Sequence, residues 1–217
     1  MRHPVLAVYA AAVASAFCSC APRTPTSEQL EAYGEGKVAY AAGRLAEAER
    51  SLELSAKDAS LPQARFLLGK TLFFLGRYDE AASVFKSLAS RFPRYREAEL
   101  WLARTFLQQG NIEEADKLAL ELIAYDSSDP RLYYLEAMVR VSEGDFKAAL
   151  GFFDRSSESG EELAKSCFES ARLYFQFGQD DKAVERLKRA QAILPPNAAM
   201  RSAVDELMKR IGARGMK

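Results

Sequence analysis

One amino-acid pattern recurs along this chain with an almost constant period. Glycine lies five residues before alanine in the segments GRLAEA, GRYDEA, GNIEEA, GDFKAA and GQDDKA, and successive glycines are 33, 34, 34 and 34 residues apart. A fixed period of this length is typical of proteins built from repeated supersecondary units. The residues that share the pattern are Gly43, Gly76, Gly110, Gly144 and Gly178, with Ala48, Ala81, Ala115, Ala149 and Ala183.

The glycines predict a pair of helices in every repeat. A helix commonly ends in a left-handed conformation that only glycine adopts at little cost, and the alanine then lies on the next helix, facing the first. Small residues seven positions before each glycine allow the paired helices to cross closely, and larger residues further on fill the space between pairs. The small residues are Gly36, Gly69, Ala103, Ala137 and Ala171, and the later ones are Leu52, Phe85, Ala119, Phe153 and Leu187.

Helix starts and the end of the array are also marked. Ser60 and Gln63 predict a capping box with Pro62 in the first turn, and Asp129 before Pro130 predicts an N-cap. An amphipathic segment follows the last repeat and predicts a helix that closes the exposed end of the array. Its apolar residues are Ala199, Val204, Leu207, Met208 and Ile211.

With the 34-residue period, these positions resemble the tetratricopeptide repeat family over roughly residues 29–197. The second copy fits best, at Leu68, Gly69, Leu72, Gly76, Tyr78, Ala81, Phe85, Leu88 and Pro93. Glu35 and Glu136 stand where the family prefers leucine, Arg140 replaces an aromatic residue and Asp180 a tyrosine-like one. The resemblance implies an all-α solenoid of five helix-turn-helix pairs and a capping helix, with boundaries near 29–61, 62–95, 96–129, 130–163, 164–197 and 198–217.

The resemblance also implies that the first helix of each pair lines a concave partner-binding surface. Its ligand-facing positions form two apolar rows, which include Val141, beside a row that is basic except at Met138. The predicted partner-binding groove contains Tyr33, Lys37, Tyr40, Phe66, Lys70, Phe73, Leu100, Arg104, Leu107, Tyr134, Phe168, Arg172 and Phe175.

Aromatic residues beside cations suit an extended peptide or a partner helix that carries acidic groups. The alternative is that the apolar rows pack between adjacent first helices while the cations form a solvated face. No residue of the basic row is asparagine, which disfavours the carboxylate clamp that some family members use for the C-terminus of a chaperone.

The N-terminus predicts export and a lipid anchor. After Arg2, residues 5–17 are uncharged and mostly apolar. This stretch is shorter than the roughly 20 residues that span a bilayer and has the length of a signal-peptide core. Ser19-Cys20 resembles the bacterial lipobox, so we expect residues 1–19 to be a signal peptide, Cys20 to be lipidated and residues 20–28 to be a tether. Cleavage without lipidation and a buried N-terminal helix are the alternatives.

The mature chain would lack the side chains of common catalytic sites. His3 is the only histidine and Cys167 would be the only thiol, so no catalytic triad, Cys–His pair or histidine-bound metal is expected. No phosphate-binding or dinucleotide-binding glycine motif is present. Removing residues 1–19 takes away only one charged residue, Arg2, and leaves 29 basic against 30 acidic residues. We therefore expect no enzyme, cofactor or metal, and no nucleic-acid partner.

These features predict a protein-binding scaffold of the bacterial envelope that is anchored by lipid. The favoured location is the outer membrane, with the protein facing the periplasm. Three classes of envelope protein resemble this architecture: the repeat lipoprotein of outer-membrane barrel assembly, the pilotins of secretins and pili, and the repeat partner of a periplasmic solute-binding system. The sequence does not separate them.

The lipid anchor can be tested by metabolic labelling. In expressing bacteria, labelled palmitate should appear on the wild-type protein and be absent from a Cys20→Ala variant, because that thiol is the acceptor. Equal labelling of the two proteins would contradict the prediction.

Overall fold

A computed structural model describes residues 24–57, 60–156, 160–195 and 198–215. The ordered elements in these ranges are helices, and no strand occurs in them. The predicted signal peptide and Cys20 lie outside the described residues.

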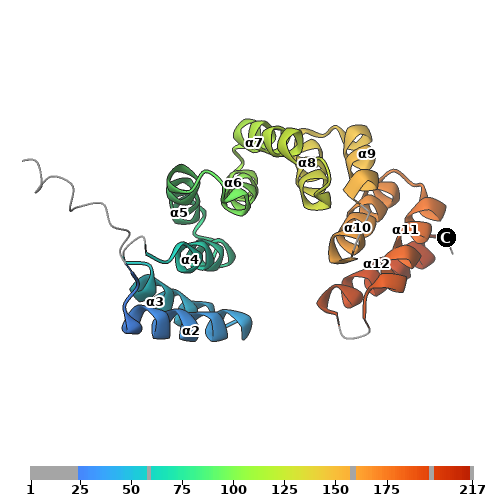
Figure 1. The fold of residues 1–217 in the computed structure, drawn as a ribbon. Helices are drawn as coiled ribbons and strands as arrows, with labels where there is room; N and C mark the ends of the chain where they lie inside the picture. The colour runs from blue at the N-terminus through green and yellow to red at the C-terminus, as the bar shows by residue number, and fades with distance from the viewer. Residues whose placement is uncertain (1–23, 58–59, 157–159, 196–197, 216–217) are drawn as a thin grey trace, which may run out of the picture. The chain divides into compact units, whose positions relative to one another are not determined.

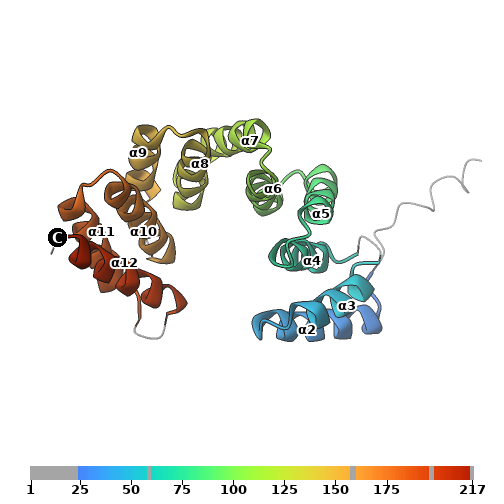
Figure 2. The same cartoon turned by 180° about the vertical axis from the view of Figure 1, so that it is seen from behind.

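The described helices follow one another in two compact units, one ending at Gly76 and the other starting at Arg77. Within each unit every helix packs against the next in the chain (Figure 1), and the view from behind shows the same neighbours (Figure 2). The first unit contains α2 (Ser27–Ala41), α3 (Leu45–Ser55) and α4 (Pro62–Phe74). The second contains α5 (Tyr78–Arg91), α6 (Arg96–Gln109), α7 (Ile112–Tyr125), α8 (Pro130–Glu143), α9 (Phe146–Ser156), α10 (Gly160–Gln176), α11 (Asp180–Ile193) and α12 (Ala199–Gly215).

The first helices of successive pairs also touch each other. α2 contacts α4 in the first unit, and α6, α8, α10 and α12 contact one another in succession in the second. The predicted all-α solenoid of helix-turn-helix repeats is therefore confirmed. No described helix has both the length and the apolar character needed to cross a membrane.

The repeated glycines end the first helices as predicted. All five have positive φ, between 71° and 82°. At Gly110, which is the C-cap of α6, this conformation lets the Asn111 amide donate to the Phe106 carbonyl at 2.9 Å. The glycine thus closes one helix and turns the chain into the next within two residues.

Small residues bring the paired helices together, also as predicted. The alanines Ala48, Ala81, Ala115, Ala149 and Ala183 are all 0% exposed. At Gly36 on α2, an added Cβ would lie 2.7 Å from Cγ of Leu52 on α3, which is itself 0% exposed. The contact leaves no space for a methyl group, so the close crossing depends on glycine at this position.

Of the two predicted helix starts, one is confirmed and one is wrong. Asp129 caps α8, because its carboxylate accepts the Arg131 amide at 2.9 Å. The N-cap of α4 is Leu61, which makes no side-chain cap hydrogen bond, so Ser60 is not the cap residue and the predicted capping box is wrong. Pro62 takes the first helical position, which its fixed φ favours, and this places Ser60 one residue too early. A capping box occurs instead at the start of α2, between Thr26 and Gln29.

The helix-crossing alanines can be tested with Ala115→Leu in α7. Three extra carbons at a fully buried position should lower the free energy of unfolding by about 1–3 kcal/mol, measured by denaturant titration. Ala124→Leu on the exposed face of the same helix should change it by less than about 0.5 kcal/mol. Equal losses in the two variants would show that helix propensity, and not the crossing, is limiting.

Candidate functional site

A cavity of about 570 Å³ lies among the first helices of the second unit. α10 supplies the largest share of its lining, α8 and the start of α9 supply one side, and α12 supplies another. This arrangement follows from the contacts of α10 with both α8 and α12. The lining residues are Met138, Val141, Phe146, Phe168, Glu169, Arg172, Leu173, Phe175, Gln176, Ala203, Glu206, Leu207 and Arg210.

The charged side chains of the cavity are balanced in sign. Arg172 donates to Glu169 at 2.8 Å on α10, and the Arg172 side chain is 59% exposed. Burial raises the pKa of Glu169, and the charge and hydrogen bond of Arg172 offset part of that effect. Glu206 and Arg210 lie one turn apart on α12 and are both exposed. The cavity thus offers apolar surface together with two carboxylates and two guanidinium groups.

The cations of α12 hold Phe175 from one side. The Arg214 guanidinium lies 3.5 Å from the centre of the Phe175 ring, and that of Arg210 lies 5.6 Å away. Arg214 also donates to the Phe175 carbonyl at 2.8 Å and to Asp180 at 3.0 Å. Since guanidinium groups are attracted to aromatic faces, these contacts attach the terminal helix to the last repeat and fix this edge of the cavity.

The cavity gathers part of the predicted groove and several residues that the prediction missed. Phe168, Arg172 and Phe175 line it, as do Met138 and Val141 of the same rows. The missed residues are Phe146, Leu173, Gln176, Glu169, Ala203, Glu206, Leu207 and Arg210. For Leu207, the amphipathic pattern of the capping helix was a usable signal. Glu169, Leu173 and Gln176 lie on α10 itself. No repeat pattern marks the remaining missed residues, on α9 and α12, as neighbours of α10.

The predicted groove residues of the first unit form a separate cluster of aromatic rings and lysines. The Lys37 ammonium lies 5.5 Å from the centre of the Tyr33 ring. The Lys70 ammonium lies 5.4 Å from the Tyr40 ring and 5.8 Å from the Phe66 ring. These contacts bring residues of α2 and α4 to one face. Burial raises the pKa of Tyr40.

Two further phenylalanines extend this face. Phe73 and Phe74 meet edge to face with ring centres 5.5 Å apart, and Phe74 lies 6.2 Å from the Tyr40 ring. Phe74 is 52% exposed and was not predicted as a site residue. The sequence left two interpretations of the apolar rows: a surface that contacts a partner, and packing between adjacent first helices. The contacts between these rings and their remaining exposure are compatible with both. The rings pack between first helices and still present surface.

The remaining predicted groove residues line neither the cavity nor the face of the first unit. Leu100 is 2% exposed and packs in the core with Ala103 and Leu122. Leu107 packs against the same core. Arg104 lies with its guanidinium 5.2 Å from the Trp101 ring, and Tyr134 tilts against Phe153 at 5.9 Å.

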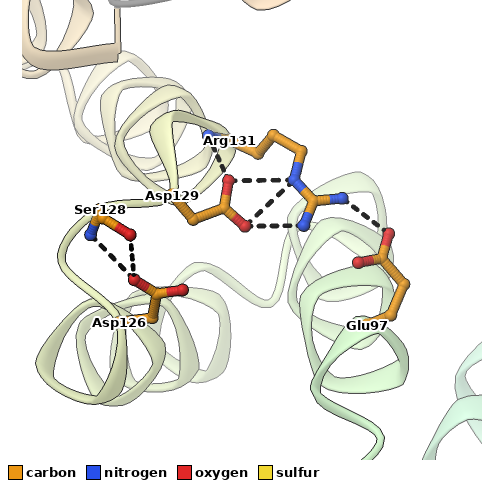
Figure 3. Close-up of polar contacts among 5 residues, drawn as sticks. All are labelled: Glu97, Asp126, Ser128, Asp129 and Arg131. Atoms are coloured by element: carbon orange, nitrogen blue, oxygen red, sulfur yellow. Dashed lines mark hydrogen bonds and ion pairs between the residues drawn. The ribbon is translucent and has the colours of Figure 1, made fainter.

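An ion-pair cluster joins α6 to the start of α8 (Figure 3). Arg131 donates to Asp129 at 2.7 Å and to Glu97 of α6 at 2.9 Å. In the adjoining turn, Asp126 accepts from the Ser128 amide at 2.9 Å and from its hydroxyl at 2.6 Å. In the described ranges, no group of three or more His, Cys, Asp or Glu side chains is arranged to hold a metal ion. Because Arg131 of α8 is paired with Glu97 of α6, this cluster acts as a brace between two repeats.

The brace shifts the titration of its members. Burial alone would raise the pKa of Asp129, but hydrogen bonds from the Arg131 side chain and amide outweigh it, and the pKa is lowered. The pKa of Arg131 is raised, chiefly by its hydrogen bond to Asp129. Both groups are therefore charged at neutral pH.

Comparison with family models identifies the repeats. A model described as tetratricopeptide repeat matches residues 72–139, and a second model with the same description matches residues 33–96. Human protein O-mannosyl-transferase TMTC1 is 25% identical over 138 residues, which are 60% of this chain and 15% of that protein. Anaphase-promoting complex subunit 3 of Schizosaccharomyces pombe is 22% identical over 139 residues, which are 64% of this chain and 21% of that protein. The chain thus spans about a fifth or less of these curated relatives.

Solved structures share the fold. A thermophilic tetratricopeptide repeat protein from Thermus thermophilus superposes with a TM-score of 0.73 at 20% identity, covering 83% of this chain and 98% of that one. MamA from Desulfovibrio magneticus superposes with a TM-score of 0.62 at 17% identity, covering 78% and 97%. At these identities the similarity establishes the fold alone.

The brace can be tested with Asp129→Ala. Loss of the N-cap and of the Arg131 partner should cost about 0.5–2 kcal/mol at pH 7. Because the pKa of Asp129 is lowered in the folded state, its contribution is present above the ordinary value of about 3.9 and is lost as pH falls through the folded value. The difference between wild type and variant should therefore shrink below about pH 4 in denaturant titrations. Asp126→Ala, in the exposed turn, should cost less at pH 7, and an equal cost would contradict the brace.

Proposed function

We propose that this chain, which belongs to the tetratricopeptide repeat family, is a scaffold that binds a partner protein and does not catalyse a reaction. The observation that carries the proposal is the cavity beside α10, which combines apolar walls with a balanced set of charged side chains. Protein-binding surfaces commonly have an apolar centre with aromatic and arginine residues, surrounded by polar groups. The cavity beside α10 has this composition.

The contacts suggest how a partner segment would bind. Apolar side chains of the partner would lie against Val141, Phe168 and Leu173, where burial of apolar surface supplies most of the affinity. Its charged groups would pair with Arg172 and Glu206 near the solvent. Arg172 would exchange part of its bond with Glu169 for a partner carboxylate, so binding should weaken as salt rises.

The first unit would supply a second contact surface. Lys37 and Lys70 are held on aromatic rings, so their ammonium groups are already positioned and less side-chain entropy is lost on binding. Exposed Phe74 adds apolar area beside them. This face would prefer an acidic segment that also carries apolar side chains.

We further propose that the scaffold works in the bacterial cell envelope, attached through lipid on Cys20 and facing the periplasm from the outer membrane. The support is the signal-peptide pattern followed by Ser19-Cys20, and the tether of residues 20–28 would let the repeats reach a partner at a distance from the membrane. Within this setting, assembly of outer-membrane, pilus or secretin machinery and assistance to a periplasmic solute-binding system are the two alternatives.

The transferase named among the relatives does not change the proposal. The shared region covers 15% of that protein, at 25% identity. We infer a shared binding module and no shared chemistry.

The proposal can be tested by affinity capture of partners from the envelope fraction of the native bacterium, followed by mass spectrometry. Arg172→Ala combined with Phe168→Ala should reduce capture of a specific partner on the order of fivefold, because each removes surface from the cavity. Arg189→Ala, on the exposed side of α11 outside the cavity, is the matched control and should capture as wild type does. Phe66→Ala with Lys70→Ala tests the first unit in the same way.

Melting temperatures separate binding from folding in this experiment. Phe168 also packs against the core of the last repeat, so the single variant Arg172→Ala is needed if the double variant is unstable. Capture that is unchanged in the cavity variants would refute the cavity as the binding site. A partner lost only in the Phe66 and Lys70 variant would place binding on the first unit.

A further inference from the structure

Glu136 is a buried acid in a place where a repeat of this type normally has an apolar residue. It lies on α8 and its side chain is 0% exposed. Its Oε1 accepts from Arg140 Nε at 2.7 Å, whereas its buried Oε2 has no hydrogen-bond partner among the described residues. A buried charged oxygen without a partner is costly, so the site has an unusual arrangement that packing alone does not require.

Arg140 joins Glu136 to two other acids. Its Nη2 contacts Glu136 at 2.6 Å and also donates to Asp116 of α7, while its Nη1 donates to Glu143 at 2.7 Å. One guanidinium group therefore faces three carboxylates. Because Asp116 and Glu136 share one nitrogen of Arg140, their carboxylates lie beside each other across the contact of α7 with α8.

We propose that this cluster is a proton-operated lock between α7 and α8, tightest when Glu136 carries a proton. The proton makes the buried group neutral and gives it an O–H that can donate a hydrogen bond to the adjacent Asp116 carboxylate. When the proton leaves for solvent, three negative charges share one positive charge, and one buried oxygen has no donor. Arg140 and Asp116 act on the Glu136 carboxyl directly, whereas Glu143 acts on Arg140.

The direction of the titration agrees with this geometry. Burial raises the pKa of Glu136, the hydrogen bond and charge of Arg140 lower it, and Asp116 raises it again, with a net upward shift. A group with a raised folded pKa contributes stability that is fully present below the unfolded value, near 4.3, and is lost as pH rises through the folded value. The lock should therefore loosen as the pH rises from acid toward neutral.

The lock acts on a helix that lines the candidate site. Met138 and Val141 of α8 are part of the cavity wall, and Glu136 and Arg140 lie on the same helix. How firmly α8 is held to α7 thus sets how firmly one wall of the cavity is held. A scaffold built in this way would bind its partner with a dependence on the pH of its surroundings.

The lock can be tested by melting the lipid-free mature chain between pH 5 and 8 as wild type, Glu136→Gln and Glu143→Gln. The melting temperature of wild type relative to Glu136→Gln should fall as pH rises. The expected fall is about 3–5 °C for each pH unit by which the folded pKa of Glu136 exceeds the unfolded one. The melting temperature of Glu143→Gln, taken relative to that of Glu136→Gln, should also fall as pH rises. Glu143 has a side chain that is 37% exposed, and this variant keeps Glu136 intact. Glu136→Leu, which restores an apolar residue, should lack the trend and serves if the Gln variant does not fold.

Two site-resolved measurements decide the mechanism. In ¹³C spectra of glutamate carboxyl groups, the Glu136 signal should titrate above the ordinary value near 4.3. Amide exchange in α8, corrected for the intrinsic effect of pH, should accelerate toward neutral pH in wild type and not in Glu136→Gln. A Glu136 carboxyl that titrates at or below its ordinary value, or identical pH profiles for wild type and both Glu136 variants, would overturn the proposal.

Discussion

The close crossing of two helices within each repeat is the contact on which the rest of this structure depends. It requires a small residue on each helix, and Gly36 with its neighbour Leu52 shows how little tolerance exists, because a single methyl group would lie 2.7 Å from the leucine side chain. Once the pair is closed, the large residue one turn further along the second helix is fully buried, as Phe153 is at 1% exposure. Packing of that residue against the following first helix then stacks one pair on the next.

Stacking of the first helices explains why part of the candidate site was predictable from the sequence. Residues spaced by three or four positions share one face of a helix, and the ligand-facing positions implied by the family resemblance placed Phe168, Arg172 and Phe175 together on α10. The fold class, the left-handed glycines and the buried alanines follow from the same local rules. Leu100 has the same position in its repeat as Phe168 and is buried nevertheless. Exposure of a side chain depends on how closely the neighbouring helices approach, and the sequence pattern of one helix does not specify that distance.

Several of the residues that the sequence did not reveal come from helices other than α10. Phe146 begins a second helix, and Glu206 and Arg210 belong to the capping helix, which follows no repeat pattern. Their approach to α10 depends on contacts such as that of Arg214 with Phe175 and Asp180. Arginines provide similar links elsewhere, from Arg131 to Glu97 and from Arg186 to Asp154 at 2.7 Å. Each exposed pair is worth little by itself, yet each spans adjacent repeats and limits how they can shift against each other.

The repeat architecture determines how far such an effect can travel. Because each repeat contacts only its neighbours, the stability of the array is close to a sum of local terms, and a charge change is felt mainly by adjacent helices. Glu136 and Arg140 depart from the family preference on α8, the helix that contacts both α6 and α10. A substitution that favours stability alone would replace this buried ion cluster with apolar residues at no loss. The cluster lies on the same helix as Met138 and Val141. The departure therefore has a physical role at the candidate site, since the helix that bears the proton-sensitive cluster also forms the wall that a partner would touch.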